Sequence, residues 1–287
     1  MALVSLSKIL TKALNGRYGI GHFDVHNLEW MQAVLNAAKE ERSPVILGVT
    51  EDAVSYFGGF SVPVKLAEAL IKEMKLGVPV VVHLDHGSSV ENCIKAIDAG
   101  FTSVMIDASH HPLDENIRQT KEVVTYARKY GVTVEAEVGS VGGSEGSDKV
   151  TDPVYADPIE CIDLVKRTQV DCLAPALGSV HGIYRGAPKL DFEGMKEISQ
   201  LTKVPLVLHG SSGLSADHIK RTIALGTAKI NVNADNHLSF SKAVRNCLEN
   251  DKGLYDASVY GSLGREQLKE TIRIKMRLFG SVGKAIE

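Results

Sequence analysis

Short apolar runs alternate with longer amphipathic stretches along most of the chain. Each apolar run is closed by polar or turn-forming residues, which is typical of strands buried on both faces of a parallel sheet. The predicted strands span residues 18–25, 45–50, 78–85, 103–108, 132–139, 172–177, 205–210 and 229–234. The predicted helices between them span residues 28–41, 63–75, 90–99, 114–129, 158–168, 192–201 and 216–225. A strand followed by a helix is therefore the repeating unit of the chain.

Eight strands that alternate with helices can close into a (β/α)8 barrel or spread into a doubly wound sheet. The barrel is favoured, because the strand count fits and no Gly-x-Gly-x-x-Gly follows the first strand. A first helix at residues 6–14 and a helical tail at residues 265–279 are additions to it. No linker divides the chain, so we predict a single TIM-barrel domain over residues 1–287. Residues 141–152 are rich in Gly, Ser and Asp, which predicts a mobile loop.

Composition and net charge limit the classes of binding partner and the cellular compartment that we expect for this chain. The formal net charge of −3, with no basic block, argues against nucleic acid or an anionic membrane as a partner. No apolar run approaches the ~20 residues that cross a bilayer, and the first residues lack the apolar core of a signal peptide. Four scattered cysteines without a Cys-x-x-Cys pair fit thiols in a reducing compartment. We expect a soluble cytoplasmic protein.

Polar residues collect where the predicted strands end, and barrels of this kind place their chemistry at the C-terminal strand ends. His86, His181 and His209 each follow a strand and each precede a glycine. Three imidazoles that leave one coordination position open are a ligand set of catalytic Zn²⁺. Asp85 directly precedes His86, and this pair could instead cap the following helix. His83, inside the strand, is expected to be a packed core histidine.

Carboxylates accompany the three histidines in the sequence. Asp85, Asp107 and Glu137 all stand near strand ends. They could orient metal-bound imidazoles, or one of them could act as the acid or base.

A second signal concerns phosphate. Glycine-rich or amide-rich turns at residues 178–182, 209–213 and 231–233 connect late strands to the helices that follow. Backbone amides at such turns bind anions, and barrels commonly hold phosphate at the last two strands. A plain helix start is the alternative for Gly-Ser-Ser-Gly, whereas Arg185 and Lys189 could add positive charge. Metal and phosphate together suggest a phosphosugar enzyme that uses metal-polarised carbonyl chemistry.

The motifs that carry these residues resemble those of the class II, zinc-dependent ketose-bisphosphate aldolases, above all fructose-bisphosphate aldolase. The resemblance runs in order from about residue 18 to residue 240. Its matching segments are His-Leu-Asp-His-Gly-Ser at 83–88, Ser-Val-Met-Ile-Asp-Ala-Ser at 103–109, Val-Glu-Ala-Glu-Val-Gly at 134–139, Ala-Leu-Gly-Ser-Val-His-Gly at 176–182, Val-Leu-His-Gly at 207–210 and Ala-Lys-Ile-Asn-Val-Asn at 228–233.

The resemblance implies one Zn²⁺ per subunit on the three histidines, with Glu137 as an alternate ligand and Asp107 beside them. It implies that Asp85 is the acid or base at the C4 hydroxyl of the substrate. Glu145, in the predicted loop, matches the base that exchanges a proton with the three-carbon carbanion, and Asn231 helps to stabilise that species. Cleavage to dihydroxyacetone phosphate and glyceraldehyde 3-phosphate is the reaction expected.

The resemblance also implies a phosphate site and an assembly. The residues expected near phosphate are Gly182, Arg185, Gly210, Ser211, Ser212, Asn231, Asn233 and Ala234, with Thr50 near the distal phosphate. A monovalent cation (Na⁺ or K⁺) near these turns and a homodimer or homotetramer are further expectations.

Several positions depart from the family pattern. Asp24 and His26 stand where relatives usually carry Asn, and Ala234 lacks the usual threonine hydroxyl. Ser258 occupies the place of the arginine expected to hold the C6 phosphate, although Arg265 or Arg277 could compensate. Fructose 1,6-bisphosphate is the default substrate, and a weaker demand for the C6 phosphate is expected.

Other readings remain open at this point. The same chemistry could act on tagatose 1,6-bisphosphate, on a deoxy-keto-gluconate phosphate or on another ketose 1-phosphate. A noncatalytic phosphosugar-binding relative and a metal-dependent sugar-phosphate isomerase are the alternatives from other classes. A Schiff-base lysine is disfavoured, because residues 172–177 contain none and Lys229 is placed at a strand start.

Overall fold

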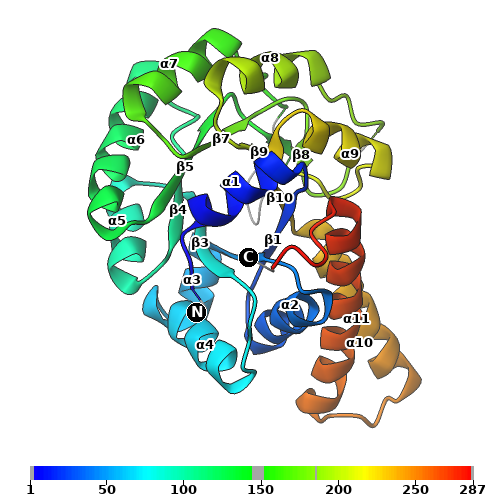
Figure 1. The fold of residues 1–287 in the computed structure, drawn as a ribbon. Coiled ribbons are helices and arrows are strands. Elements are labelled where there is room, and N and C mark those ends of the chain that lie inside the picture. The colour runs from blue at the N-terminus through cyan, green and yellow to red at the C-terminus, as the bar shows by residue number, and fades with distance from the viewer. Residues whose placement is uncertain (1–2, 144–151, 185, 286–287) are drawn as a thin grey trace.

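The computed structural model describes residues 3–143, 152–184 and 186–285, and it contains a closed barrel of parallel strands (Figure 1). Around the barrel the order is β1-β10-β9-β7-β5-β4-β3-β2, with every neighbouring pair parallel. The bounds are β1 (Ile20–Asp24), β2 (Val45–Thr50), β3 (Val80–Gly87), β4 (Ser103–Ile106), β5 (Thr133–Val138), β7 (Cys172–Pro175), β9 (Leu206–Leu208) and β10 (Thr227–Val232). The predicted (β/α)8 barrel is confirmed.

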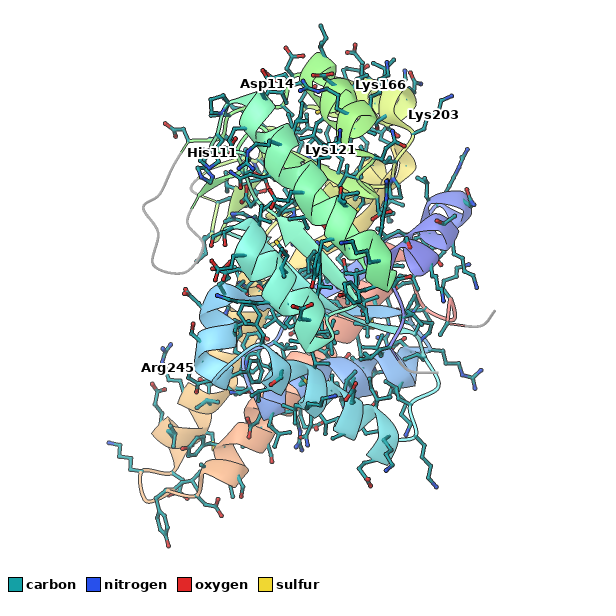
Figure 2. The ribbon with its side chains drawn as sticks, turned by 90° about the vertical axis from the view of Figure 1, so that its left-hand side faces the viewer. His111, Asp114, Lys121, Lys166, Lys203 and Arg245 are labelled. Carbon is teal, nitrogen blue, oxygen red and sulfur yellow. The ribbon has the colours of Figure 1, made fainter. Side chains whose placement is uncertain are left out.

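Helices cover the outside of the barrel. Their bounds are α2 (Leu28–Glu41), α3 (Glu51–Phe57), α4 (Ser61–Glu73), α5 (Val90–Ala99), α6 (Leu113–Ala127), α7 (Pro158–Thr168), α8 (Phe192–Thr202), α9 (Ala216–Ala224), α10 (Ala234–Asn250) and α11 (Ala257–Phe279), with a 3-10 turn at Arg128–Tyr130. Figure 2 looks onto this layer and shows Asp114 and Lys121 of α6 on its outer side. The large apolar core lies between these helices and the strands.

Local sequence sets the ends of these helices. Side-chain oxygens of Asn27, Ser89 and Ser215 accept hydrogen bonds from backbone N–H groups in the first turns of α2, α5 and α9. Such caps satisfy donors that have no partner within the helix. Gly100 follows α5 with a φ of 101°, a left-handed conformation that costs glycine little.

The sequence did not predict three parts of the fold. The short helix α3 follows β2 directly, and α10 forms a helical hairpin with α11, which also packs against α2. A two-stranded sheet joins β6 (Gly142–Gly143) to β8 (Val180–His181). Segments this short carry no periodicity, which explains why the apolar pattern missed α3, β6 and β8.

The N-terminal helix α1 (Leu6–Gly16) closes one end of the barrel, as Figure 1 shows from that side. Its apolar side chains, such as Leu6 and Leu10, pack with inward-facing strand residues, such as Ile20 and Val81, in a cluster separate from the outer core. The extra helix expected at the N-terminus is confirmed, and it removes this end of the barrel interior from water.

Beyond that apolar end, the barrel interior is polar. Residues two apart on a strand share a face, so Val81, His83 and Asp85 follow one another along the inner side of β3. The same succession gives an inner tier of His22, His83, Glu135 and Lys229 and an upper tier of Asp24, Asp85, Glu137 and Asn231. All eight are buried, so strands that read as apolar runs carry polar groups on their inner face.

The placement of Lys229 at a strand start was wrong. Strand β10 begins at Thr227 rather than at Lys229, so the lysine stands inside the barrel and is fully buried. Its Nζ lies 2.8 Å from Oε2 of Glu135. The ammonium thus forms an ion pair inside the barrel.

None of the helices in the described ranges is long and apolar enough to cross a membrane.

Candidate active site

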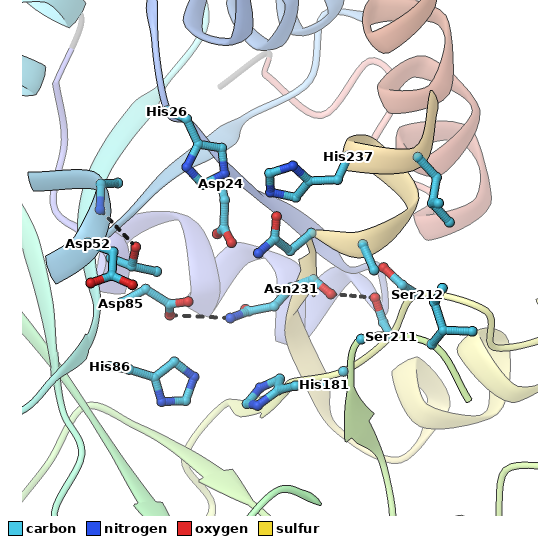
Figure 3. A pocket seen from close by; sticks show the side chains of 18 of the residues that line it. Asp24, His26, Asp52, Asp85, His86, His181, Ser211, Ser212, Asn231 and His237 are labelled. Atoms are coloured by element: carbon cyan, nitrogen blue, oxygen red, sulfur yellow. Dashed lines mark hydrogen bonds between the residues drawn. The ribbon is translucent and has the colours of Figure 1, made fainter. Parts of the chain in front are cut away.

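A cavity of about 820 Å³ opens at the C-terminal ends of the strands. Figure 3 shows its floor, where Asp85, Asn231, His86 and His181 lie close together. The residues that line it are Asp24, His26, Thr50, Glu51, Asp52, Ala53, Tyr56, Asp85, His86, His181, Gly182, Ile183, Gly210, Ser211, Ser212, Asn231, Asn233, Ala234, His237 and Leu238. Most strand-end residues singled out from the sequence therefore meet at one cavity.

His86 owes its direction to an irregularity in β3. Pairing between β3 and β4 shifts register after Leu84, and His86 has a φ of 48°. The left-handed conformation is uncommon for a residue with a side chain, and it lets His86 face the cavity although Asp85 precedes it. Nδ1 of His86 donates to Oδ2 of Asp107 at 2.8 Å, which leaves Nε2 directed toward the other histidines.

His209 follows β9 and is held by a carboxylate from inside the barrel. Its Nε2 donates to Oε1 of Glu135 at 2.8 Å, and its Nδ1 lies 2.9 Å from Nε2 of His86. With its hydrogen on Nε2, a neutral His209 presents the lone pair of Nδ1 to His86.

His181 completes the group from β8. Its ring centroid lies 5.1 Å from that of His86 and 5.8 Å from that of His209. One ligand atom from each of these histidines comes within 4.8 Å of the others, and we call the three residues the mouth cluster. Burial lowers the pKa of His181 to about 4 and lowers that of His209 well below its usual value, so both are neutral ligands at neutral pH.

The mouth cluster fits the zinc that the resemblance implies. Three imidazoles at an open cavity are the donor set of a catalytic zinc site. Asp107 and Glu137 form a second ligand group with His86. Burial opposes ionisation of Asp107, but hydrogen bonds from His86 and Ser109 outweigh it and lower the pKa of Asp107. The structure thus brings all five predicted metal-site residues together.

Asp85 lies on the cavity floor beside the mouth cluster. It accepts a hydrogen bond from Nδ2 of Asn231 at 3.3 Å (Figure 3). Nζ of Lys229 lies 3.9 Å from its Oδ1. Burial alone would raise the pKa of Asp85, yet the surrounding imidazoles and the Lys229 ammonium lower it well below the usual value. The group is therefore a carboxylate at neutral pH, ready to accept a proton.

The predicted phosphate residues line the opposite side of the cavity. Gly210 has a φ of 64°, and a Cβ there would collide with the backbone of Val180, so glycine is required. Oγ of Ser211 donates to the carbonyl of Asn231, and Oγ of Ser212 accepts from the backbone N–H of Asp235 at 3.2 Å. The N-terminus of the 17-residue helix α10 lies at this side, which favours an anion.

The part of the cavity around Thr50, which we call the distal side, is lined by different kinds of side chain. Thr50 ends β2 and caps α3 by accepting from the backbone N–H of Ala53 at 3.2 Å. Asp24, Glu51 and Asp52 also line this region, and the described lining contains neither Arg nor Lys. The distal side thus offers carboxylates, whereas the phosphate side offers hydroxyls and amides.

Some predicted residues stand elsewhere. Glu145 and Arg185 lie outside the described residues. Ser258 is at the start of α11, where it contacts Asp256, and it does not line the cavity. Arg265 donates to Gln32 and Arg277 pairs with Glu41. Neither arginine lines the described cavity, and both side chains are engaged between α2 and α11.

Sequence reasoning missed several residues around the cavity. His26, Trp30 and His237 form a ring cluster in which the centroids of His26 and His237 lie 4.7 Å apart. His22 lies below the cavity floor, beside His83, which is buried inside the barrel as expected, and burial lowers their pKa values to about 3 and about 4. The alternation in Ile20-Gly-His-Phe-Asp24 was the signal that could have placed His22 beside Asp24 inside the barrel.

Two neutral histidines, two carboxylates and a lysine thus meet inside the barrel, and we call His22, His83, Asp85, Glu135 and Lys229 the core cluster. It lies directly beneath the mouth cluster, to which it is linked through Glu135 and His209.

A parallel (β/α)8 barrel with three histidines and flanking carboxylates at its C-terminal mouth is typical of barrel enzymes that use a metal ion. A family profile described as "Fructose-bisphosphate aldolase class-II" matches residues 4–284. The chain belongs to the class II fructose-bisphosphate aldolase family, and the predicted enzyme type, an aldolase and hence a carbon–carbon lyase, is confirmed.

Individual relatives agree with this assignment. The chain is 56% identical to the fructose-bisphosphate aldolase of Geobacillus stearothermophilus over 287 residues, which is 100% of each chain. It is 51% identical to the fructose-bisphosphate aldolase of Staphylococcus aureus strain Mu50, covering 99% of this chain and 100% of the other. The crystal structure of the YdjI aldolase from Escherichia coli K12 superposes with a TM-score of 0.85 at 36% identity, covering 99% of each chain.

Proposed function

We propose that this protein is a zinc-dependent aldolase that reversibly cleaves a ketose phosphate into dihydroxyacetone phosphate and an aldehyde. The convergence of His86, His181 and His209 at the cavity floor is the observation that carries the proposal. Zinc bound there would act as a Lewis acid that stabilises the negative charge developing beside the substrate carbonyl.

Asp85, Asn231 and Glu145 are assigned the proton transfers and the positioning that the reaction also requires. Asp85, ionised and 3.3 Å from Asn231, accepts the proton of the C4 hydroxyl as the C3–C4 bond breaks and returns it in the reverse direction. Asn231 fixes the position of that carboxylate and offers its amide to the developing oxyanion. We assign Glu145 as the base that exchanges the proton of the three-carbon product, on the family resemblance alone.

The phosphate of the three-carbon half is assigned to the side formed by Gly182, Gly210, Ser211, Ser212, Asn233 and Ala234. Hydroxyl groups, backbone amides and the N-terminus of α10 supply its donors. Arg185 and a monovalent cation, expected from the family, would add positive charge. Thr50 is assigned to the distal half of the substrate.

Fructose 1,6-bisphosphate is the substrate that the family and the named relatives favour. The carboxylates near Thr50, together with Ser258 in place of an arginine, favour weak dependence on the C6 phosphate. Tagatose 1,6-bisphosphate, a deoxy-keto-gluconate phosphate and other ketose 1-phosphates remain within the same chemistry. We further propose a cytoplasmic homodimer or homotetramer.

A substrate panel with the zinc-loaded enzyme tests the proposal, with release of triose phosphate followed in a coupled assay. Fructose 1,6-bisphosphate and fructose 1-phosphate are expected to give similar values of kcat/KM. A strong preference for the bisphosphate would contradict the weak C6 dependence but not the aldolase activity.

Removing the metal with a chelator distinguishes an aldolase from a noncatalytic binding protein and from an isomerase. Removal of the metal should abolish cleavage, and added Zn²⁺ should restore it. A noncatalytic binding protein would release no triose in either state. An isomerase would convert the sugar without releasing triose.

A further inference from the structure

The buried pair of Glu135 and Lys229 lies outside the cavity lining but contacts a mouth-cluster histidine. Both side chains are fully buried, and Oε2 of Glu135 lies 2.8 Å from Nζ of Lys229. The other oxygen, Oε1, accepts the Nε2 hydrogen of His209 at 2.8 Å. One carboxylate therefore joins an internal ammonium to a proposed zinc ligand.

We propose that Glu135 and Lys229 are positioning residues that set the tautomer and orientation of His209 for metal binding. A hydrogen on Nε2 leaves the lone pair on Nδ1, the nitrogen that lies 2.9 Å from Nε2 of His86. A carboxylate that accepts from the outer nitrogen of an imidazole also makes the inner nitrogen a stronger donor to a metal. This inference rests on the zinc-dependent function proposed above.

Lys229 is needed because an isolated carboxylate is costly in the interior of a protein. Its Nζ is the ammonium nearest to Glu135 among the described ion pairs, and it also lies 3.9 Å from Asp85. His83 completes the surroundings, with Nε2 3.7 Å from Oε2 of Glu135. The lysine thus holds the far oxygen of Glu135, which leaves the near oxygen free to face His209.

Lys229 also lies beside a second group of potential ligands lower in the barrel. His22, His83 and Asp85 bring ligand atoms within 4.8 Å of one another, as a metal site would. The ammonium already supplies positive charge there. The same lysine therefore serves the core cluster and, through Glu135, the mouth cluster.

The first test measures zinc affinity of the metal-free protein by competition with a chromogenic chelator. Glu135→Gln and Lys229→Met should each lower the affinity about 10- to 100-fold. The double variant Glu135→Gln/Lys229→Met removes both buried charges, so its melting temperature should recover toward that of the wild type. Its zinc affinity should stay low, because His209 still lacks a charged acceptor.

Glu41→Gln is the matched control. Glu41 is a buried carboxylate paired with Arg273 and Arg277 between α2 and α11, remote from the cavity. This variant should lose thermal stability and keep wild-type zinc affinity. A folded double variant that binds zinc within about threefold of the wild type would overturn the proposal.

A second measurement uses the unmodified zinc-loaded protein and does not depend on how the variants fold. Nitrogen-15 spectra of its histidines should show His209 with hydrogen on Nε2 and metal on Nδ1. Metal on Nε2 would contradict the inference. If the wild type binds no zinc, the proposed function fails; if it binds zinc and the variants match it, only this inference fails.

Discussion

The mouth cluster and the core cluster each bring potential metal-ligand atoms close together, but only the core cluster contains an ammonium group. In the core cluster the Lys229 ammonium lies 2.8 Å from Glu135 and 3.9 Å from Asp85. In the mouth cluster two imidazole nitrogens face each other at 2.9 Å beside an open cavity, with no ammonium among the described contacts. The comparison teaches that ligand types alone do not define a metal site; an internal cation can satisfy the same groups.

The largest effect is expected from a mouth-cluster ligand. His181→Ala should lose zinc and lower kcat/KM about 10³-fold or more, because the metal supplies several kcal/mol of charge stabilisation. Metal content and steady-state kinetics measure both effects. His83→Gln, in the core cluster, should retain zinc. Equal zinc loss in the two variants would contradict the prediction that the mouth cluster, and not the core cluster, binds zinc.

Asp85 belongs to the core cluster but faces the cavity, so its replacement should separate chemistry from metal binding. Asp85→Asn keeps the shape of the side chain and removes the proton acceptor. We expect kcat to fall about 10²- to 10⁴-fold, with zinc content unchanged. A fall of less than about tenfold would argue against the assigned proton transfer.

Acid should destabilise the metal-free protein through the core histidines. The folded pKa values of His22 and His83 are lowered to about 3 and about 4 from 6.5, so the unfolded chain binds more protons below pH 6.5. The free energy of unfolding should therefore fall as the pH drops from 6.5 toward 4, by up to about 1.4 kcal/mol per pH unit for each imidazole. Urea unfolding at several pH values measures this slope, which His83→Gln should make shallower.

The smallest effect is expected on the phosphate side. Ser212→Ala removes one hydroxyl and should weaken substrate binding by about 1 kcal/mol, which raises KM roughly fivefold. Initial rates at varied substrate concentration measure it. Ser258→Ala, at the start of α11, is the matched control and should leave KM unchanged. An equal rise in both variants would contradict the assignment of Ser212.

The sequence was sufficient to predict the barrel fold and the residues that lie at its mouth. Strands buried on both faces read as apolar runs, and a histidine followed by glycine stands near the end of three of them. Parallel strands in a closed barrel bring their C-terminal ends together, so His86, His181 and His209 could be expected to meet. Their mutual distances, and the turn that redirects His86, depend on backbone conformation that apolar spacing does not encode.

The polar interior was not foreseen, for a physical reason. A lysine within an apolar run is expected at an exposed strand end, because an isolated ammonium is costly to bury. Its partner, Glu135, lies 94 positions earlier in the chain (229 minus 135). Only the closed arrangement of β5, β7, β9 and β10 brings the pair together.

Helix α1 covers the end of the barrel opposite the cavity. Water that entered there would reach the Lys229–Glu135 pair from below and would screen it. A chain shortened to begin after Gly16 should therefore bind zinc more weakly, although every residue at the mouth is retained. Helix α1 thus helps to keep the interior dry for the site formed at the far end.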